Sequence, residues 1–272
     1  IYLDFKQKLK LHKNKTIAIA VSGGPDSLGL TALAKAYSYE NKCKIQYVLV
    51  NHNLRKNSSK EAEAVKKLLK KKNIHLNILS NKNLITKNIQ SKARVIRYDL
   101  ISAFCKKKNI KKVVTAHHLE DQVETFFIRL SRGSGLHGLS SMRTITKIGP
   151  NLHLVRPLLN VKKSLLIKIA KSIFGKFFKD PTNKDKKYLR TKIRHLKSQL
   201  EKSGIKHEQI IRSINNIAST KDTLNNYLEK VKQTYVKTKK KQTLINLKNL
   251  FLEPDEIKLK VLGNEIKTFS KS

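Results

Sequence analysis

Short apolar runs alternate with longer segments of helical spacing over the first 130 or so residues. The apolar runs lie at 17–22, 45–51, 75–80 and 112–116. A helical pattern follows each run, with apolar residues three or four positions apart on one face. The first of these segments begins after a glycine-containing turn and ends at about Tyr39, and the others cover 61–72, 93–105 and 120–130. Strand–helix–strand units at this spacing make right-handed crossovers and a mainly parallel sheet. We therefore predict an α/β fold, a Rossmann-like parallel sheet flanked by helices, with ligands beyond the carboxyl ends of its strands.

The second half of the chain changes character. A small-residue loop with three glycines follows Ser131, a hairpin is expected over 144–157, and a helix over 161–174. From residue 185 onward the pattern is helical and rich in lysine. We predict two domains, residues 1–200 and a small, basic, mostly helical domain of residues 201–272.

The charge balance points to a polyanionic partner. Lys and Arg number 59 against 19 Asp and Glu, a net charge of +40, which attracts phosphate-rich partners such as nucleic acid. A genome bias toward lysine is the alternative. No apolar run reaches the roughly 18 residues of a membrane span, and two distant cysteines fit a reducing cytoplasm rather than a disulfide scaffold.

Arginines are informative in a chain that otherwise uses lysine, because their planar fork binds phosphate or carboxylate through two hydrogen bonds. Nine of the ten lie between Arg55 and Arg194. Arg94 and Arg97, three apart, predict an anion between them. Four others are candidate nucleic-acid contacts: Arg129 and Arg132 beside the glycine loop, and Arg190 and Arg194 four apart on a helix. For each of these arginines the alternative is a solvated basic face.

A glycine turn follows the first predicted strand and opens a helix, with the sequence Ser22-Gly23-Gly24-Pro25-Asp26-Ser27. Its backbone N–H groups and the helix N-terminus favour an anion. It lacks the Lys and Ser or Thr of a Walker loop. Asp26 beside a phosphate favours a bridging Mg²⁺. The alternative is a capped turn without a ligand.

Acidic residues and paired histidines follow the strand at 112–116. Asp121 and Glu124 share a helix face, and with Asp26 they are expected at one rim of the sheet, where they suit a metal or a cationic substrate. Helix capping is the competing explanation. His117 and His118 suit a structural or general-base role better than zinc, since no third ligand has metal spacing.

Taken together, these segments resemble a known family. The glycine turn is similar to the pyrophosphate loop of ATP pyrophosphatases, which adenylate an oxygen atom. The more specific segments, in order over residues 15–197, resemble tRNA(Ile)-lysidine synthetases: Asn51–Arg55, Ala93–Tyr98, Thr115–Thr125, Arg132–Leu139, Arg156–Leu159, and Asp180–Asn183 through Arg194-His195.

The resemblance implies an ATP-dependent ligase. Such enzymes attach L-lysine to carbon 2 of the wobble cytidine in isoleucine tRNA with a CAU anticodon, releasing AMP and pyrophosphate. By this resemblance Ser22, Gly23, Gly24, Pro25, Asp26 and Ser27 bind ATP, and Asp26 binds Mg²⁺. It also implies that Asp26, Asp121 and Glu124 bind lysine, that Arg94 and Arg97 hold phosphates or the activated intermediate, and that His117 or His118 positions groups or transfers a proton.

Departures from the family pattern leave rival functions open. The family often has Arg-Asn-x-Ile-Arg-His where this chain has Arg190-Thr191-Lys192-Ile193-Arg194-His195, which bears on tRNA placement. Many members have two C-terminal domains, and this chain has room for one. The rivals are a tRNA thiolase, a small-molecule ATP-dependent amidase and an inactive RNA-binding protein. A cytoplasmic location is expected, and the sequence leaves a homodimer open.

Overall fold

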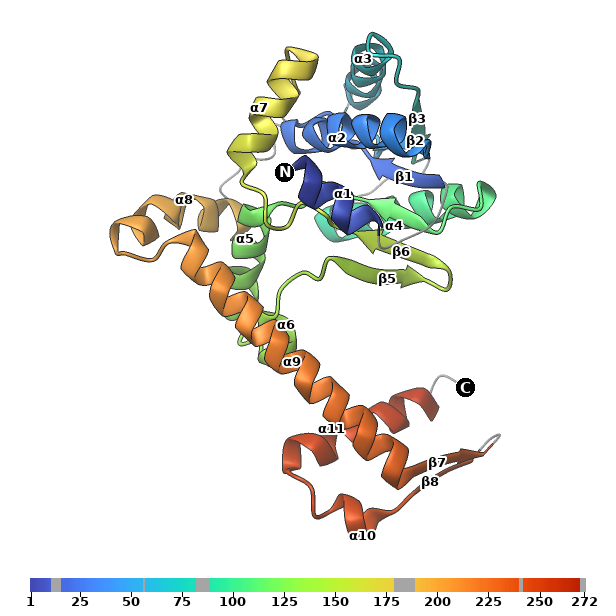
Figure 1. Cartoon of the computed structure of the whole chain (residues 1–272), viewed down its shortest axis with the longest axis vertical. Coiled ribbons are helices and arrows are strands. Elements are labelled where there is room, and N and C mark those ends of the chain that lie inside the picture. Colours follow the sequence, from blue (N-terminus) through green and yellow to red (C-terminus); the bar gives the residue numbers. More distant parts are fainter. Residues whose placement is uncertain (11–15, 56, 82–88, 179–188, 240–241, 270–272) are drawn as a thin grey trace.

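The computed structural model describes residues 1–10, 16–55, 57–81, 89–178, 189–239 and 242–269 (Figure 1). Its six-stranded sheet has the order β3-β2-β1-β4-β6-β5. All neighbouring pairs are parallel except β5 and β6, which form an antiparallel hairpin. The predicted α/β fold with a mainly parallel sheet is therefore confirmed, as is the hairpin predicted over 144–157.

Apart from the first helix and the short sixth helix, which were not predicted, the elements of the first part of the chain follow the predicted alternation. In chain order they are α1 Tyr2–Lys10, β1 Thr16–Ala20, α2 Pro25–Asn41, β2 Lys44–Asn51, α3 Ser58–Lys70, β3 Leu76–Ser80, α4 Ile89–Lys107, β4 Lys112–Val114, α5 Leu119–Leu130, α6 Leu136–Leu139, β5 Ile145–Gly149, β6 Leu152–Val155 and α7 Lys163–Phe174.

Helices cover both faces of the sheet. Alternate residues of a strand point to opposite faces, and the apolar side chains on each face are buried under helices. Ile17 and Ile19 of β1 pack in a large core with α1, α2, α3 and α7. Ala18, between them, belongs to a second core that contains Ile101 and Cys105 of α4. Because β1, β2, β3, β4 and β6 are parallel, their carboxyl ends lie at one rim of the sheet.

The C-terminal region consists of α8 Leu189–Lys202, α9 His207–Tyr235, β7 Val236–Lys239, β8 Gln242–Ile245, α10 Leu247–Leu250 and α11 Asp255–Phe269. Its mostly helical character is as predicted, whereas the β7–β8 hairpin was not predicted. The long helix α9 runs from the sheet part of the molecule to a separate small core around Leu228, Leu250 and Val261 (Figure 1). The domain division at residue 200 stays a prediction.

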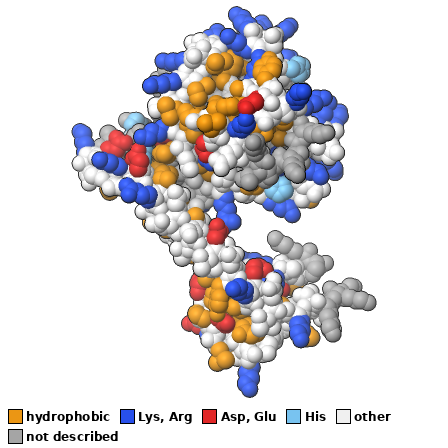
Figure 2. Space-filling view, viewed as in Figure 1, with side chains coloured by type: hydrophobic (Ala, Val, Ile, Leu, Met, Phe, Trp, Pro, Cys, Tyr) orange, Lys and Arg blue, Asp and Glu red, His pale blue; other side chains and the backbone are white. Residues whose placement is uncertain are grey.

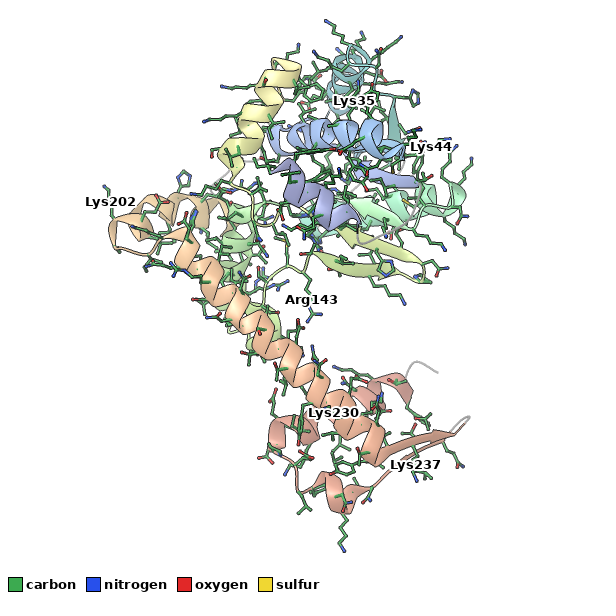
Figure 3. All side chains as sticks on the ribbon, in the orientation of Figure 1. Lys35, Lys44, Arg143, Lys202, Lys230 and Lys237 are labelled. Atoms are coloured by element: carbon green, nitrogen blue, oxygen red, sulfur yellow. The ribbon has the colours of Figure 1, made fainter. Side chains whose placement is uncertain are left out.

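The first turns of α9 pack against the sheet part of the molecule. Ile210 and Ile214 are buried against Leu119 and Val123 of α5. Further along α9, Lys221 donates a hydrogen bond to the His137 carbonyl, and Asp222 pairs with Arg143. Figure 3 shows Arg143 near α9. The glycine loop and the C-terminal region are thus joined by direct polar contacts. No helix among the described residues is long and apolar enough to cross a membrane.

Candidate active site

The candidate site lies at the topological switch point of the sheet, where successive strands change from one side of β1 to the other. β1 pairs with β2 on one side and with β4 on the other, and the chain first builds outward to β3 before it returns to β4. Ligands of open α/β sheets bind in the crevice at this switch point. The turn 22–27 follows β1, and His117 and His118 follow β4, so the fold brings these two predicted segments together.

The conformation of the turn after β1 is fixed by hydrogen bonds from its own side chains and from a neighbouring segment. The Ser27 hydroxyl accepts a hydrogen bond from the Ser22 N–H at 3.1 Å and donates one to the Gly24 carbonyl at 2.9 Å. Gly23 has a φ of +80°, and its carbonyl accepts a hydrogen bond from the Phe178 N–H at 3.0 Å. Because α2 begins at Pro25, its unpaired N–H groups lie at this turn and can bind phosphate.

His118 lies among three carboxylates and is only 2% exposed. Its Nε2 lies 3.6 Å from Asp26 Oδ2 and 3.5 Å from Asp121 Oδ2, and its Nδ1 lies 3.1 Å from Glu120 Oε2. Its backbone N–H also donates to Asp121 at 3.1 Å. We call these four residues the His118 cluster. It joins the turn after β1 to the start of α5.

The cluster favours a charged His118 beside a neutral His117. Burial lowers the pKa of His118, but the facing carboxylates more than compensate and raise it to about 9. Burial likewise opposes ionisation of Glu120, yet His118 and the Lys163 N–H lower the pKa of that carboxyl to about 2. Burial, with the charges of Arg156, Arg190 and Arg94, lowers the pKa of His117 to about 4, although Asp121 opposes this shift. Near neutral pH, these shifts leave His118 protonated and His117 neutral.

Glu124 is brought to the same helix face but is already paired. It is 6% exposed, and its carboxylate lies 2.7 Å from Arg190 Nε and 2.6 Å from Arg194 Nε. Arg190 also lies 3.8 Å from Asp121. The two arginines that were predicted to contact tRNA therefore fix α8 onto α5. Contact of Glu124 with lysine, and of these arginines with tRNA, stays a prediction that requires these ion pairs to open.

The other predicted arginines, Arg94, Arg97 and Arg129, contact different groups. Arg94 lies over the Tyr98 ring, with 5.2 Å from Cζ to the ring centroid, and its charge acts on His117. Arg97 acts instead on His52, at the end of β2. Arg129 donates to the carbonyls of Gly138 and Ser141 at 2.6 and 2.9 Å.

Two sequence predictions remain, a tRNA contact of Arg132 and a functional role of the segment Asp180–Asn183. Arg132 is exposed in the glycine loop, where a tRNA contact stays a prediction. The segment Asp180–Asn183 lies outside the described residues.

Asp26 has the surroundings that a magnesium ligand needs. Its Oδ1 is enclosed and has no hydrogen-bond partner, while Oδ2 faces His118. Among the described residues, no group of three or more His, Cys, Asp or Glu side chains could hold a metal ion. Magnesium commonly binds through one or two carboxylates together with substrate phosphates and water. Asp26 therefore fits such a shared site.

Several residues of the site were not singled out from the sequence. Glu120 completes the His118 cluster, and its position within the motif after β4 was the available signal. Lys163 Nζ lies 3.7 Å from Asp26, although these residues are far apart in the chain and no local pattern links them. His52 directly follows β2, and both of its ring nitrogens are enclosed without a hydrogen-bond partner. Its place after a strand was the only sequence signal.

Comparison with known proteins identifies the family. A family model described as "PP-loop domain" matches residues 2–201. The chain belongs to the PP-loop family. A curated relative from Orientia tsutsugamushi (strain Boryong), "tRNA(Ile)-lysidine synthase", is 40% identical over 68% of this chain and 42% of its own length. Another of that name, from Wolbachia sp. subsp. Brugia malayi (strain TRS), is 33% identical over 99% of this chain and 63% of its own length.

These relatives are longer than the chain, which spans between 42% and 63% of their length. Among solved structures, the U34-tRNA thiolase NcsA from Methanococcus maripaludis with its [4Fe-4S] cluster aligns with a TM-score of 0.65 over 80% of this chain and 79% of that one. At 18% sequence identity, this likeness shows a shared PP-loop fold alone. We refer to the turn 22–27, which follows β1, as the PP-loop of this chain.

Proposed function

We propose that this chain attaches L-lysine to carbon 2 of the wobble cytidine in CAU-anticodon isoleucine tRNA, with ATP converted to AMP and pyrophosphate. The observation that carries the proposal is the meeting of the PP-loop and the His118 cluster at one rim, through the 3.6 Å contact between Asp26 and His118. A phosphate-binding turn beside carboxylates suits ATP together with a cationic amine. The names of the longer relatives favour lysine as that amine.

The reaction follows from the chemistry of the substrate. Oxygen 2 of cytosine is a poor leaving group, and transfer of AMP from ATP to that oxygen makes it a good one while pyrophosphate leaves. The lysine amine then forms a bond to carbon 2, the bond from carbon 2 to the adenylated oxygen breaks, and AMP departs. The amine loses a proton in this step, for which we assign neutral His117 as the acceptor.

The PP-loop and the His118 cluster divide the remaining tasks. The PP-loop N–H groups stabilise charge on the transferred phosphate. Mg²⁺ bound at Asp26 would neutralise phosphate charge. The charged His118 fixes Asp26 and Asp121, and we assign Asp121 to the lysine amine. Arg97, exposed on α4, remains the candidate for an ATP phosphate contact.

A thiolase is less well supported by the residues present. The chain has two cysteines, and both lie away from the rim: Cys43 precedes β2, and Cys105 is buried near the end of α4. Burial raises the pKa of both thiols, to about 11 for Cys105, which disfavours the reactive thiolate. We infer that the reaction takes place in the cytoplasm, where tRNA and ATP meet. A homodimer stays a prediction.

Asp121→Asn is expected to raise the Michaelis constant for lysine about 30-fold while ATP binding persists, because a charged hydrogen bond to the amine contributes roughly 2 kcal/mol. Steady-state kinetics with varied lysine and equilibrium dialysis with ATP measure the two effects. Asp99→Asn, at an exposed position on α4, is the matched control. An unchanged lysine dependence in Asp121→Asn would remove this residue from lysine binding.

Lysines of the C-terminal region are expected to contribute to tRNA affinity through phosphate contacts. Figure 2 shows Lys and Arg side chains over both the sheet part and the C-terminal region, and Figure 3 places Lys230 and Lys237 on the latter. Replacing both by Gln should reduce the slope of log affinity against log salt by up to about 2. Lys44→Gln, at the opposite rim of the sheet, is the control. Equal slopes for all proteins would place the tRNA elsewhere.

A further inference from the structure

Three arginines from α4, from α5 and from the end of β6 lie close enough for their charges to interact. Arg156 follows β6 and donates to the Arg143 carbonyl at 2.8 Å and to Thr146 Oγ1 at 2.9 Å. Arg129 holds the other end of the same segment through the carbonyls of Gly138 and Ser141. Arg94 lies over Tyr98, which also contacts Arg156. We call Arg94, Arg129 and Arg156 the arginine cluster.

The cluster carries charge that the protein does not neutralise. Within the described part of the chain, no carboxylate pairs with any of its three members, whereas Arg190 and Arg194 both lie on Glu124. Arg156 is only 6% exposed, and its Nε–H is enclosed without an acceptor. Burial lowers the pKa of Arg156, and the charges of Arg94 and Arg129 lower it further, although Tyr98 opposes the shift. A buried guanidinium with an unused donor costs free energy unless an anion completes it.

The position of the cluster separates it from the PP-loop. The PP-loop follows β1, and N–H groups at the start of α2 are available there for ATP. In the cluster, Arg129 is on α5, Arg156 follows β6 and Arg94 is on α4, and the loop held by Arg129 and Arg156 contacts α9 through Arg143 and Asp222. His117 lies within reach of the charges of Arg94 and Arg156. An RNA strand that places a base at His117 would therefore bring its backbone to the cluster.

We propose that Arg94, Arg129 and Arg156 bind one phosphate of the RNA strand at the nucleotide that is modified. This inference rests on the proposed function for the identity of the RNA. Guanidinium groups suit the task because they bind phosphate oxygens through paired, charge-assisted hydrogen bonds. The site fixes the backbone of the target nucleotide and leaves the base free to reach the PP-loop.

The test couples one arginine to one phosphate. Isoleucine tRNAs are assembled with a single neutral methylphosphonate at each linkage of the anticodon loop, and their affinities for the unaltered protein and for Arg94→Gln are measured. At one linkage next to the wobble cytidine, the methylphosphonate should weaken binding to the unaltered protein about tenfold. The methylphosphonate at this linkage should cause little further loss of affinity in Arg94→Gln, because the phosphate contact is already lost. Arg156→Lys, which keeps the charge and loses the planar fork, should show the same coupling.

A control variant and a measurement of ATP binding separate the outcomes. Lys106→Gln, an exposed cation on the same helix, should keep the full methylphosphonate effect. Additive losses at every linkage would overturn the phosphate site, as would a weaker affinity of Arg94→Gln for ATP alone with unchanged RNA binding. Failure of the unaltered protein to bind the tRNA would overturn it as well. RNA binding and coupling without lysine incorporation would instead contradict only the proposed function.

Discussion

Gly23→Ala should lower the efficiency of ATP use by about 100-fold, because a small displacement of a phosphate-binding turn is sufficient for such a loss. Gly23 has a φ of +80°, which an alanine adopts only with strain. A Cβ at this position would lie 2.5 Å from Val65 Cγ2, and Val65 is fixed in the core at 2% exposure. The turn must therefore move, and its N–H groups move with it. Formation of AMP in the presence of tRNA, and ATP binding by dialysis, measure the effect.

The neighbouring glycine supplies the matched control. Gly24 has a φ of −72°, and a Cβ there would meet only Ser22 Oγ at 3.6 Å and the Phe178 carbonyl at 3.9 Å, which are ordinary contacts. Gly24→Ala should therefore retain ATP use within about threefold, since neither strain nor overlap displaces the turn. If the two variants lost activity equally, the geometry assigned to this turn would be wrong.

The free energy of unfolding should depend on pH through His118. Its folded-state pKa of about 9 lies above the ordinary value of 6.5, so the proton stabilises the folded state. That contribution is complete below pH 6.5 and is lost as the pH rises through 9. The shift corresponds to about 3 kcal/mol, because one pKa unit is roughly 1.4 kcal/mol. The stability difference between the unaltered protein and His118→Gln should shrink by this amount from pH 6 to pH 10.

Denaturant titrations with a chelator and without nucleotide measure this difference free of ligand effects. Comparing the variant with the unaltered protein at each pH removes the contribution of the many lysines, which titrate in both. His195→Gln, at an exposed position on α8, is the control and should show no such trend. A difference for His118→Gln that stays constant with pH would show that its imidazole is not held as a cation.

The sequence predicted what depends on local pattern. The alternation of apolar runs and helical segments was sufficient for the parallel sheet, and the position of Ser22–Ser27 was sufficient to place this turn between the first strand and the helix that follows it. Asp121 and Glu124 were correctly placed on one helix face because three-residue spacing is a local property.

The features that the sequence did not predict depend on packing between distant segments. Nothing in the local sequence distinguishes Gly23 from Gly24, since their difference comes from the positive φ of Gly23 and from Val65 in another helix. The pairing of Glu124 with Arg190 and Arg194 joins residues about 70 positions apart. The hairpin β7–β8 was missed because its residues lie in a lysine-rich stretch with a weak strand pattern.

Incorporation of labelled lysine into unmodified CAU-anticodon isoleucine tRNA, with ATP and Mg²⁺, tests the central claim most directly. The same tRNA with uridine at the wobble position is the control. The account predicts label in the cytidine tRNA alone, with one AMP released for each lysine incorporated. AMP release without label would mean that the adenylating site acts with another nucleophile. Binding of the tRNA with neither AMP nor label would contradict the proposed reaction and identify the chain as an RNA-binding protein.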